Sequence, residues 1–199
     1  FLYKNLLGWE EPARPLPQRE LNPLAYGSLF HQVLERFFET FGTEFWNKDE
    51  SLGKWQKTVA KVAEEEFDSL LEHYPLSGDL VRRQQLARLL GELKEFMDFI
   101  WRHDASQFVA AERAFGFDED VELAAGDRSL YVRGFIDLIH TTGKMTQIWD
   151  FKTGRCHPKQ GDEAGATPAL DAQVALYGLV AKKLAKEWNL KTDLQVAYV

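Results

Sequence analysis

Cysteine is nearly absent from this 199-residue chain, which contains one, Cys156. One thiol can form neither an internal disulfide nor a four-cysteine metal site, so both are excluded within the chain. Long hydrophobic runs are also missing: the apolar stretches are short and flanked by charge, which excludes a transmembrane helix. No signal-peptide pattern opens the sequence, and we expect a cytoplasmic protein without a membrane partner.

A surplus of basic residues is missing as well. The chain has 24 Lys and Arg against 31 Asp and Glu, a net charge of −7. Overall charge therefore argues against non-specific binding of nucleic acid, although a local basic groove remains compatible with it. The hydrophobic fraction of 45% is typical of a globular protein, and this length is enough to bury one sizeable core.

The ends of the sequence suggest a part of a longer protein. Residues 1–3 are apolar, and residues 194–199 read as a strand. We expect residues 1–24 to be a lead-in segment and residues 25–199 to form a single domain. Within that domain, helices are expected over residues 25–106 and a core of sheet and helix over residues 107–199.

The spacing of apolar residues changes in the middle of the chain. Helical spacing in the first half predicts three helices, of which Asp79 can cap the third. Strand-like alternation follows, and Thr142-Gly143 predicts a tight turn between two strands of a hairpin. A loop, a helix and a terminal strand complete an α/β fold with helices packed on a mixed sheet. The expected segments are helices at 25–46, 51–74 and from 79, strands at 107–117, 129–142 and 144–152, a loop at 153–168, and a helix at 168–188.

Asp150 and Lys152 are the first candidate site residues. Side chains alternate along a strand, so these two point to the same face about 6.6 Å apart. The carboxylate can hold a divalent metal, and the ammonium can orient a water or neutralise developing charge. An exposed ion pair is the alternative. However, the segment 146–151 is apolar enough to be a central strand, where a shared metal would offset the cost of burying the charge.

Asp137 belongs to the other strand of the expected hairpin. It lies about as far from the Thr142-Gly143 turn as Asp150 does, so the two carboxylates can converge on one site. Two close carboxylates repel unless they share a cation, and Mg²⁺ prefers one or two carboxylates together with water and phosphate oxygens. Gly134 leaves room for a backbone or a ligand to approach.

Three more candidates lie on expected helices. His31 follows Gly27 by four residues and can add an imidazole ligand. Gln173 and Tyr177 are also four residues apart and present an amide and a phenol on one face, which suits contacts with phosphate or water. The alternatives are an ordinary surface or core histidine and the polar edge of an amphipathic helix.

Four segments together resemble the RecB-like nuclease family of the PD-(D/E)xK superfamily. G-x-x-D and Q-x-x-x-Y are common by chance, whereas D-x-K-T-G is rare, so the ordered set carries the resemblance. It runs from about residue 25 to the C-terminus, and residues 1–9 resemble the lead-in of helicase–nuclease subunits. Ile136 replaces the Pro of the superfamily name, as is common in this branch. The segments are G-S-L-F-H (27–31), G-F-I-D (134–137), D-F-K-T-G (150–154) and Q-V-A-L-Y (173–177).

The resemblance implies a fold and a set of roles. The fold is a restriction-endonuclease-like mixed β-sheet core flanked by helices, with a helical N-terminal half. The implied cofactor is Mg²⁺ or Mn²⁺. Some members bind an iron–sulfur cluster through four cysteines, and Cys156 alone implies none within this fragment. The implied metal ligands are His31, Asp137, Asp150 and the Phe151 carbonyl. The implied catalytic residues are Asp137, Asp150, Lys152, the accessory pair Gln173 and Tyr177, and the accessory acid Glu112, for which an ion pair to Arg113 or Arg133 is the alternative.

The function that the resemblance implies is metal-dependent DNA hydrolysis. An exonuclease is expected, as a domain of a larger DNA repair or recombination protein with a helicase domain or subunit as its partner. One alternative is an inactive nuclease-like domain that binds DNA or acts as a scaffold in a helicase complex. Inactive relatives usually lose the Asp or the Lys of D-x-K, and both are present here. A hydrolase of another phosphodiester is the third possibility.

Overall fold

A computed structural model of the chain describes residues 16–102, 107–126, 128–152, 172–191 and 193–199. The expected loop, the start of the last expected helix and Cys156 lie outside the described residues, as do residues 1–15. The element order is α2 (Pro23–Trp46), α3 (Leu52–Leu71), α4 (Asp79–Arg102), β1 (Gln107–Phe115), β2 (Val121–Ala125), β3 (Arg128–Val132), β4 (Gly134–Thr142), β5 (Met145–Asp150), α5 (Ala172–Leu184) and β6 (Asp193–Tyr198).

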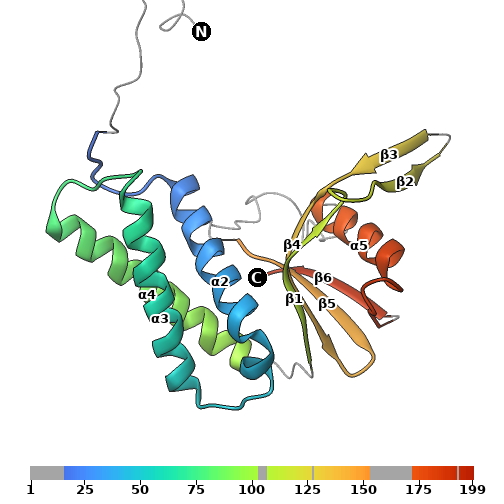
Figure 1. Cartoon of the computed structure of the whole chain (residues 1–199), viewed down its shortest axis with the longest axis horizontal. Coiled ribbons are helices and arrows are strands. Elements are labelled where there is room, and N and C mark those ends of the chain that lie inside the picture. Colours follow the sequence, from blue (N-terminus) through green and yellow to red (C-terminus); the bar gives the residue numbers. More distant parts are fainter. Residues whose placement is uncertain (1–15, 103–106, 127, 153–171, 192) are drawn as a thin grey trace, which may run out of the picture.

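The main sheet has the strand order β1-β4-β5-β6. β4 pairs antiparallel with β1 and β5, whereas β5 pairs parallel with β6, so the sheet is mixed. Helices α2, α3 and α4 lie on one side of this sheet and α5 lies on the other, while β2 and β3 form a separate ribbon (Figure 1). This architecture confirms the predicted α/β class, with a restriction-endonuclease-like mixed sheet and a helical N-terminal half.

Local signals explain where the helices begin. Asn22 caps α2 by accepting a hydrogen bond from the Ala25 backbone N–H at 2.8 Å, and Pro23 occupies the first turn. Ser51 caps α3 in the same way. Asp79 was expected to cap α4 but lies inside its first turn, where a carboxylate interacts favourably with the helix dipole.

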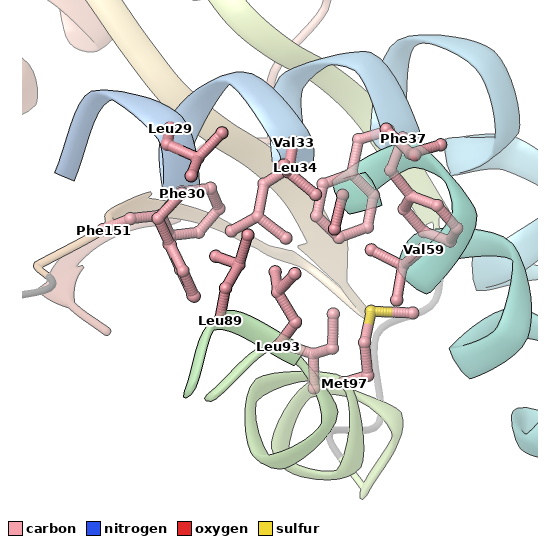
Figure 2. Close-up of a cluster of buried hydrophobic side chains, with 14 of the residues drawn as sticks. Leu29, Phe30, Val33, Leu34, Phe37, Val59, Leu89, Leu93, Met97 and Phe151 are labelled. Atoms are coloured by element: carbon pink, nitrogen blue, oxygen red, sulfur yellow. The ribbon is translucent and has the colours of Figure 1, made fainter. Parts of the chain in front are cut away.

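The larger hydrophobic core lies between the helices and the sheet. Figure 2 shows Leu29, Phe30, Val33 and Leu34 of α2 facing Leu89 and Leu93 of α4, with Phe151 beside Phe30. Phe96 of α4 contacts the Phe151 ring edge-on at 5.1 Å between centroids. Each fully buried Leu or Phe contributes roughly 1.5–3 kcal/mol. This packing fixes the first half of α2 over the end of β5.

A second core covers the opposite face of the sheet. Ile136, Ile139 and Ile148 pack there against Val180 and Ala181 of α5. Because β4 and β5 are covered on both faces, their apolar residues form nearly continuous runs. The prediction of a central strand at 146–151 is therefore confirmed.

The strands after the third helix differ from the expectation in two places. The segment expected as one strand, 129–142, is divided at Arg133: β3 pairs with β2, a strand that was not expected, and β4 joins the main sheet. The hairpin itself is confirmed, since Thr142 pairs with Met145 around Gly143, which has a φ of 58°. No helix in the described part of the chain is both long and apolar enough to span a bilayer.

Candidate metal centre

A cleft of about 910 Å³ opens at the ends of β4 and β5 that lie away from the hairpin turn. Its walls come from α2, α5, β1, β4 and the residues that follow β5. The structure therefore brings together residues as distant in the sequence as His31 and Tyr177, which are 146 positions apart. Every site residue predicted from the sequence lines this cleft: His31, Glu112, Asp137, Asp150, Phe151, Lys152, Gln173 and Tyr177.

His31, Glu112 and Asp137 form one cluster in the cleft. The imidazole Nδ1 of His31 lies 3.5 Å from Asp137 Oδ2 and 3.9 Å from Glu112 Oε1. The other ring nitrogen, Nε2, lies 3.0 Å from the carbonyl oxygen of Phe151. One ligand atom from each of the three residues lies within 4.8 Å of the others.

This spacing fits a divalent cation. Two oxygen ligands on opposite sides of an ion, with bonds of about 2.1–2.4 Å, lie about 4.2–4.8 Å apart. Carboxylates and carbonyls suit Mg²⁺ and Mn²⁺, and an imidazole is accepted by many first-row metals. The donor set can therefore hold a divalent cation of this kind without bringing in a distant side chain.

A break in strand alternation turns the acids of this cluster toward α2. Ile136 and Ile139 both pack under α5, whereas Leu138 packs on the opposite side, so the faces switch between positions 137 and 138. Strict alternation from Ile139 would have placed Asp137 on the α5 side. Because of this switch, the Asp137 side chain lies on the face of the sheet that α2 covers. Irregular strand positions of this kind often redirect side chains near active sites.

The neighbouring strand β1 has an unusual backbone conformation at the matching position. Ala111 pairs with Leu138 and Arg113 with Ile136, which leaves Glu112 beside Asp137. Glu112 has a φ of 44°, a conformation uncommon for a residue other than glycine. Such local strain is frequent at functional sites, and here it occurs where a carboxylate joins the cluster.

Burial gives the cluster unusual electrostatics. Asp137 is only 7% exposed, and this burial raises the pKa of its carboxyl to about 6. The Phe151 backbone N–H donates to Asp137 Oδ2 at 2.6 Å and opposes part of that shift. The nearby Glu112 carboxylate raises the pKa of His31 in spite of its burial. The cluster thus favours positive charge between its acids, which a cation would supply.

Asp150 belongs to a second, adjoining network. Its carboxylate is 2% exposed; Oδ1 accepts a hydrogen bond from Gln173 Nε2 at 2.8 Å and Oδ2 lies 2.5 Å from Lys152 Nζ. Lys152 also donates to Gln173 Oε1 at 3.1 Å, and Gln173 Nε2 donates to the Tyr177 hydroxyl at 2.9 Å. The Asp150–Lys152 pair is therefore not an exposed surface ion pair, because its acid is buried.

The two networks divide the predicted ligands. His31, Asp137 and the Phe151 carbonyl meet in the first network, whereas Asp150 faces Lys152 and Gln173 in the second. Glu112, expected as an accessory acid, lies in the first network, and its partner is His31. The alternative of an ion pair between Glu112 and Arg113 is not what the structure shows, since the Arg113 guanidinium lies over the ring of Trp188.

Several other residues that line the cleft were not predicted as site residues. Glu35 and Phe135 also line it. The spacing of Glu35, four residues after His31, and of Phe135, two residues before Asp137, could have identified both. The space beside Gly134 was expected to admit a backbone or a ligand, but a Cβ there would lie 3.0 Å from the ring of Phe115, which fills it.

Comparison with known proteins gives one family. Residues 1–199 match the family model described as the PD-(D/E)XK nuclease superfamily. No curated protein matches the chain. The matched region contains both networks of the cleft.

Proposed function

Because the chain belongs to the PD-(D/E)XK nuclease superfamily, we propose that it hydrolyses DNA phosphodiester bonds in the cleft between α2 and α5 with the help of a divalent metal. One observation carries the proposal: a cluster able to hold a cation adjoins a buried carboxylate that is paired with a lysine. Phosphodiester hydrolysis needs positive charge near the phosphate and a group that positions the attacking water. The two networks provide for both.

The first network would hold the metal. The ligand atoms of His31, Glu112 and Asp137 lie close enough together to share one ion, the Phe151 carbonyl lies beside the His31 ring, and Asp150 lines the same cleft. A bound divalent cation would polarise the phosphodiester and stabilise negative charge on the leaving oxygen. Mg²⁺ and Mn²⁺ are the ions we propose.

The second network would position the reactants. Lys152 can donate a hydrogen bond to a water or to a phosphate oxygen, since its ammonium lies at the cleft beside Asp150. Gln173 donates to Asp150 and Tyr177 and accepts from Lys152, so both ends of its amide are engaged. Flipping that amide would direct its oxygen at the Asp150 carboxylate. Gln173 is therefore held in one orientation and keeps Asp150 and Lys152 in place.

Finer aspects of the proposal rest on the four ordered motifs. They support a RecB-like nuclease, and with it exonuclease action, a role in DNA repair or recombination, and a helicase partner. They also support one catalytic domain over residues 25–199 after a lead-in segment. We also propose a cytoplasmic location.

A cleavage assay tests the function. Linear single- and double-stranded DNA would be incubated with Mg²⁺, Mn²⁺ or EDTA, using the wild type and the Asp150→Ala and Lys152→Ala variants. We expect cleavage that requires metal and is lost in both variants, and the product lengths then separate exonuclease from endonuclease action. Full activity of a clean Asp150→Ala preparation would contradict the proposal. DNA binding without cleavage under any of these conditions would favour the inactive scaffold.

A further inference from the structure

Two exposed aromatic rings lie side by side at the edge of the cleft. Phe117 is 52% exposed and Phe135 is 47% exposed, whereas the rings of Phe37, Phe38 and Phe67 are fully buried. The centroids of the Phe117 and Phe135 rings are 4.9 Å apart, with 38° between their planes. An exposed pair of large apolar rings next to a candidate active site indicates a binding surface.

The ring pair is continuous with the cleft. Phe135 lines the cleft and precedes Asp137 by two residues on β4, so it lies about 6.6 Å from Asp137 along the strand. The switch of faces comes after Asp137, so Phe135 and Asp137 point to the same side. A ligand bound at the carboxylates can therefore extend over Phe135 and on to Phe117.

Backbone packing fixes the position of Phe117. Gly116, which precedes it, has a φ of 74°, and a Cβ at this position would lie 2.1 Å from the Val132 carbonyl oxygen. Only glycine allows the end of β1 to approach the junction of β3 and β4 so closely. In Figure 1 this junction is where the β2–β3 ribbon meets the main sheet. This close packing of Gly116 holds the backbone of Phe117 in a defined position.

The charges around the rings indicate which part of a nucleic acid they contact. The Arg133 guanidinium lies over Phe117 at 5.8 Å from its centroid, which adds a cation beside the aromatic surface. Three acids, Asp118, Glu119 and Asp120, follow Phe117 directly. Because those acids repel phosphates, the rings are suited to contact bases, with Arg133 as the cation available to a neighbouring phosphate.

We propose that Phe117 and Phe135 form a stacking platform for unpaired bases, so that the strand bound in the cleft is single-stranded. This inference rests on the proposed function, because it specifies the substrate of the same cleft. In a duplex each base face is covered by the neighbouring base pairs, whereas an unpaired strand can place its bases on aromatic side chains. Such stacking is sequence-tolerant, since every base has a π-face.

Oligonucleotide binding tests the platform separately from catalysis. Single- and double-stranded oligonucleotides would be titrated by fluorescence anisotropy in Ca²⁺, and a 2-aminopurine base in the single strand would report stacking by its quenching. Replacing Phe135 or Phe117 by alanine is expected to weaken single-strand binding about five- to a hundredfold and to remove the quenching. Phe135→Trp, which keeps a ring, should retain both.

Tyr131→Ala is the matched control. Tyr131 is 65% exposed on β3 but does not line the cleft, so removing its ring should leave single-strand binding unchanged. Thermal unfolding of each variant would verify that these exposed positions do not affect folding.

The possible results of these experiments distinguish a failure of this inference from a failure of the proposed nuclease function. Unchanged single-strand binding in both alanine variants, or equally tight binding of duplex by the wild type, overturns the platform. If the wild type cleaves DNA in a metal-dependent way, either of these two binding results would still leave the nuclease proposal supported. Ring-dependent stacking without any cleavage supports the platform and contradicts the nuclease.

Discussion

The two ends of the β4–β5 hairpin have the same strands and the same central place in the sheet, but they bury different polar groups. At the turn end, Thr146 is fully buried and its hydroxyl accepts a hydrogen bond from the Lys191 backbone N–H at 2.8 Å. At the open end, the buried groups are the carboxylates of Asp137 and Asp150. At the turn end, the neutral Thr146 hydroxyl has a backbone partner and the buried His140 ring packs against Trp149, whereas at the open end two carboxylates lie against a cleft.

This difference distinguishes a residue suited to stabilise the fold from residues suited to bind a ligand. A buried hydroxyl with a backbone partner contributes modestly to stability, and its loss leaves the partner unsatisfied. A buried carboxylate whose pKa is raised destabilises the folded protein in its charged form. Asp137 is therefore better suited to binding a cation than to holding the hairpin together, and variants at the two ends should behave in opposite ways.

The largest effect is expected from Asp137→Asn. The amide oxygen can still accept the hydrogen bond from the Phe151 N–H, but the negative charge is lost. Cleavage should fall at least about a hundredfold, the scale of a lost electrostatic contribution to catalysis. The free energy of unfolding without metal should stay equal or rise, because a charge disfavoured by burial is gone.

Paired cleavage assays and chemical unfolding in EDTA test this expectation. The sign of the pH dependence follows from the raised pKa. The folded wild type binds the Asp137 proton more tightly than the unfolded chain, so this group lowers stability as pH rises from about 4 to about 6. The stability advantage of the variant should therefore grow over that range. A variant that unfolds more easily at pH 7 would show that Asp137 is structural.

Thr146→Val is the opposite test at the turn end. Valine has nearly the same shape but cannot accept from the Lys191 N–H, so the free energy of unfolding should fall by about 1–3 kcal/mol. In a protein of this size that lowers the melting temperature by several degrees. Metal-dependent cleavage below the melting temperature should be unchanged. Lost cleavage in a folded Thr146→Val protein would mean that the two ends are not independent.

The smallest effect is expected from Tyr177→Phe in the second network. Phenylalanine keeps the ring but removes the hydroxyl that accepts from Gln173, so the amide has one anchor fewer. A single hydrogen bond of about 0.5–1.5 kcal/mol corresponds to a roughly two- to tenfold loss of single-turnover rate. The Mn²⁺ dependence of that rate should not shift, and a large shift would place Tyr177 among the groups that control metal binding.

Much of the fold follows from local patterns in the sequence. The apolar stripe of α2 and the turn at Thr142-Gly143 are repetitive or short-range signals, and both predicted their elements correctly. The turn also fixed the register that places Asp137 near Asp150. The strand Val121–Ala125 was missed because it is five residues long and carries a Glu and two Ala, which are poor strand signals.

The details of the site depend on tertiary structure. The positive φ of Glu112 and the switch of faces after Asp137 lie at matching positions of the paired strands β1 and β4, and the expected alternation along either strand alone could not reveal them. The exposure of Phe135 could not be predicted from the sequence either, because an aromatic residue in an apolar strand is more often buried. The sequence thus predicted which residues would gather, and the structure shows how they divide into two networks.

Titration calorimetry with Mn²⁺ tests the central claim most directly, that the open end of the hairpin is built to bind a cation. The wild type, Asp137→Asn and Thr146→Val would be titrated under identical conditions. We expect the wild type and Thr146→Val to bind Mn²⁺ with equal affinity, and Asp137→Asn to bind it at least about tenfold more weakly. Equal affinity in Asp137→Asn and the wild type would contradict the account.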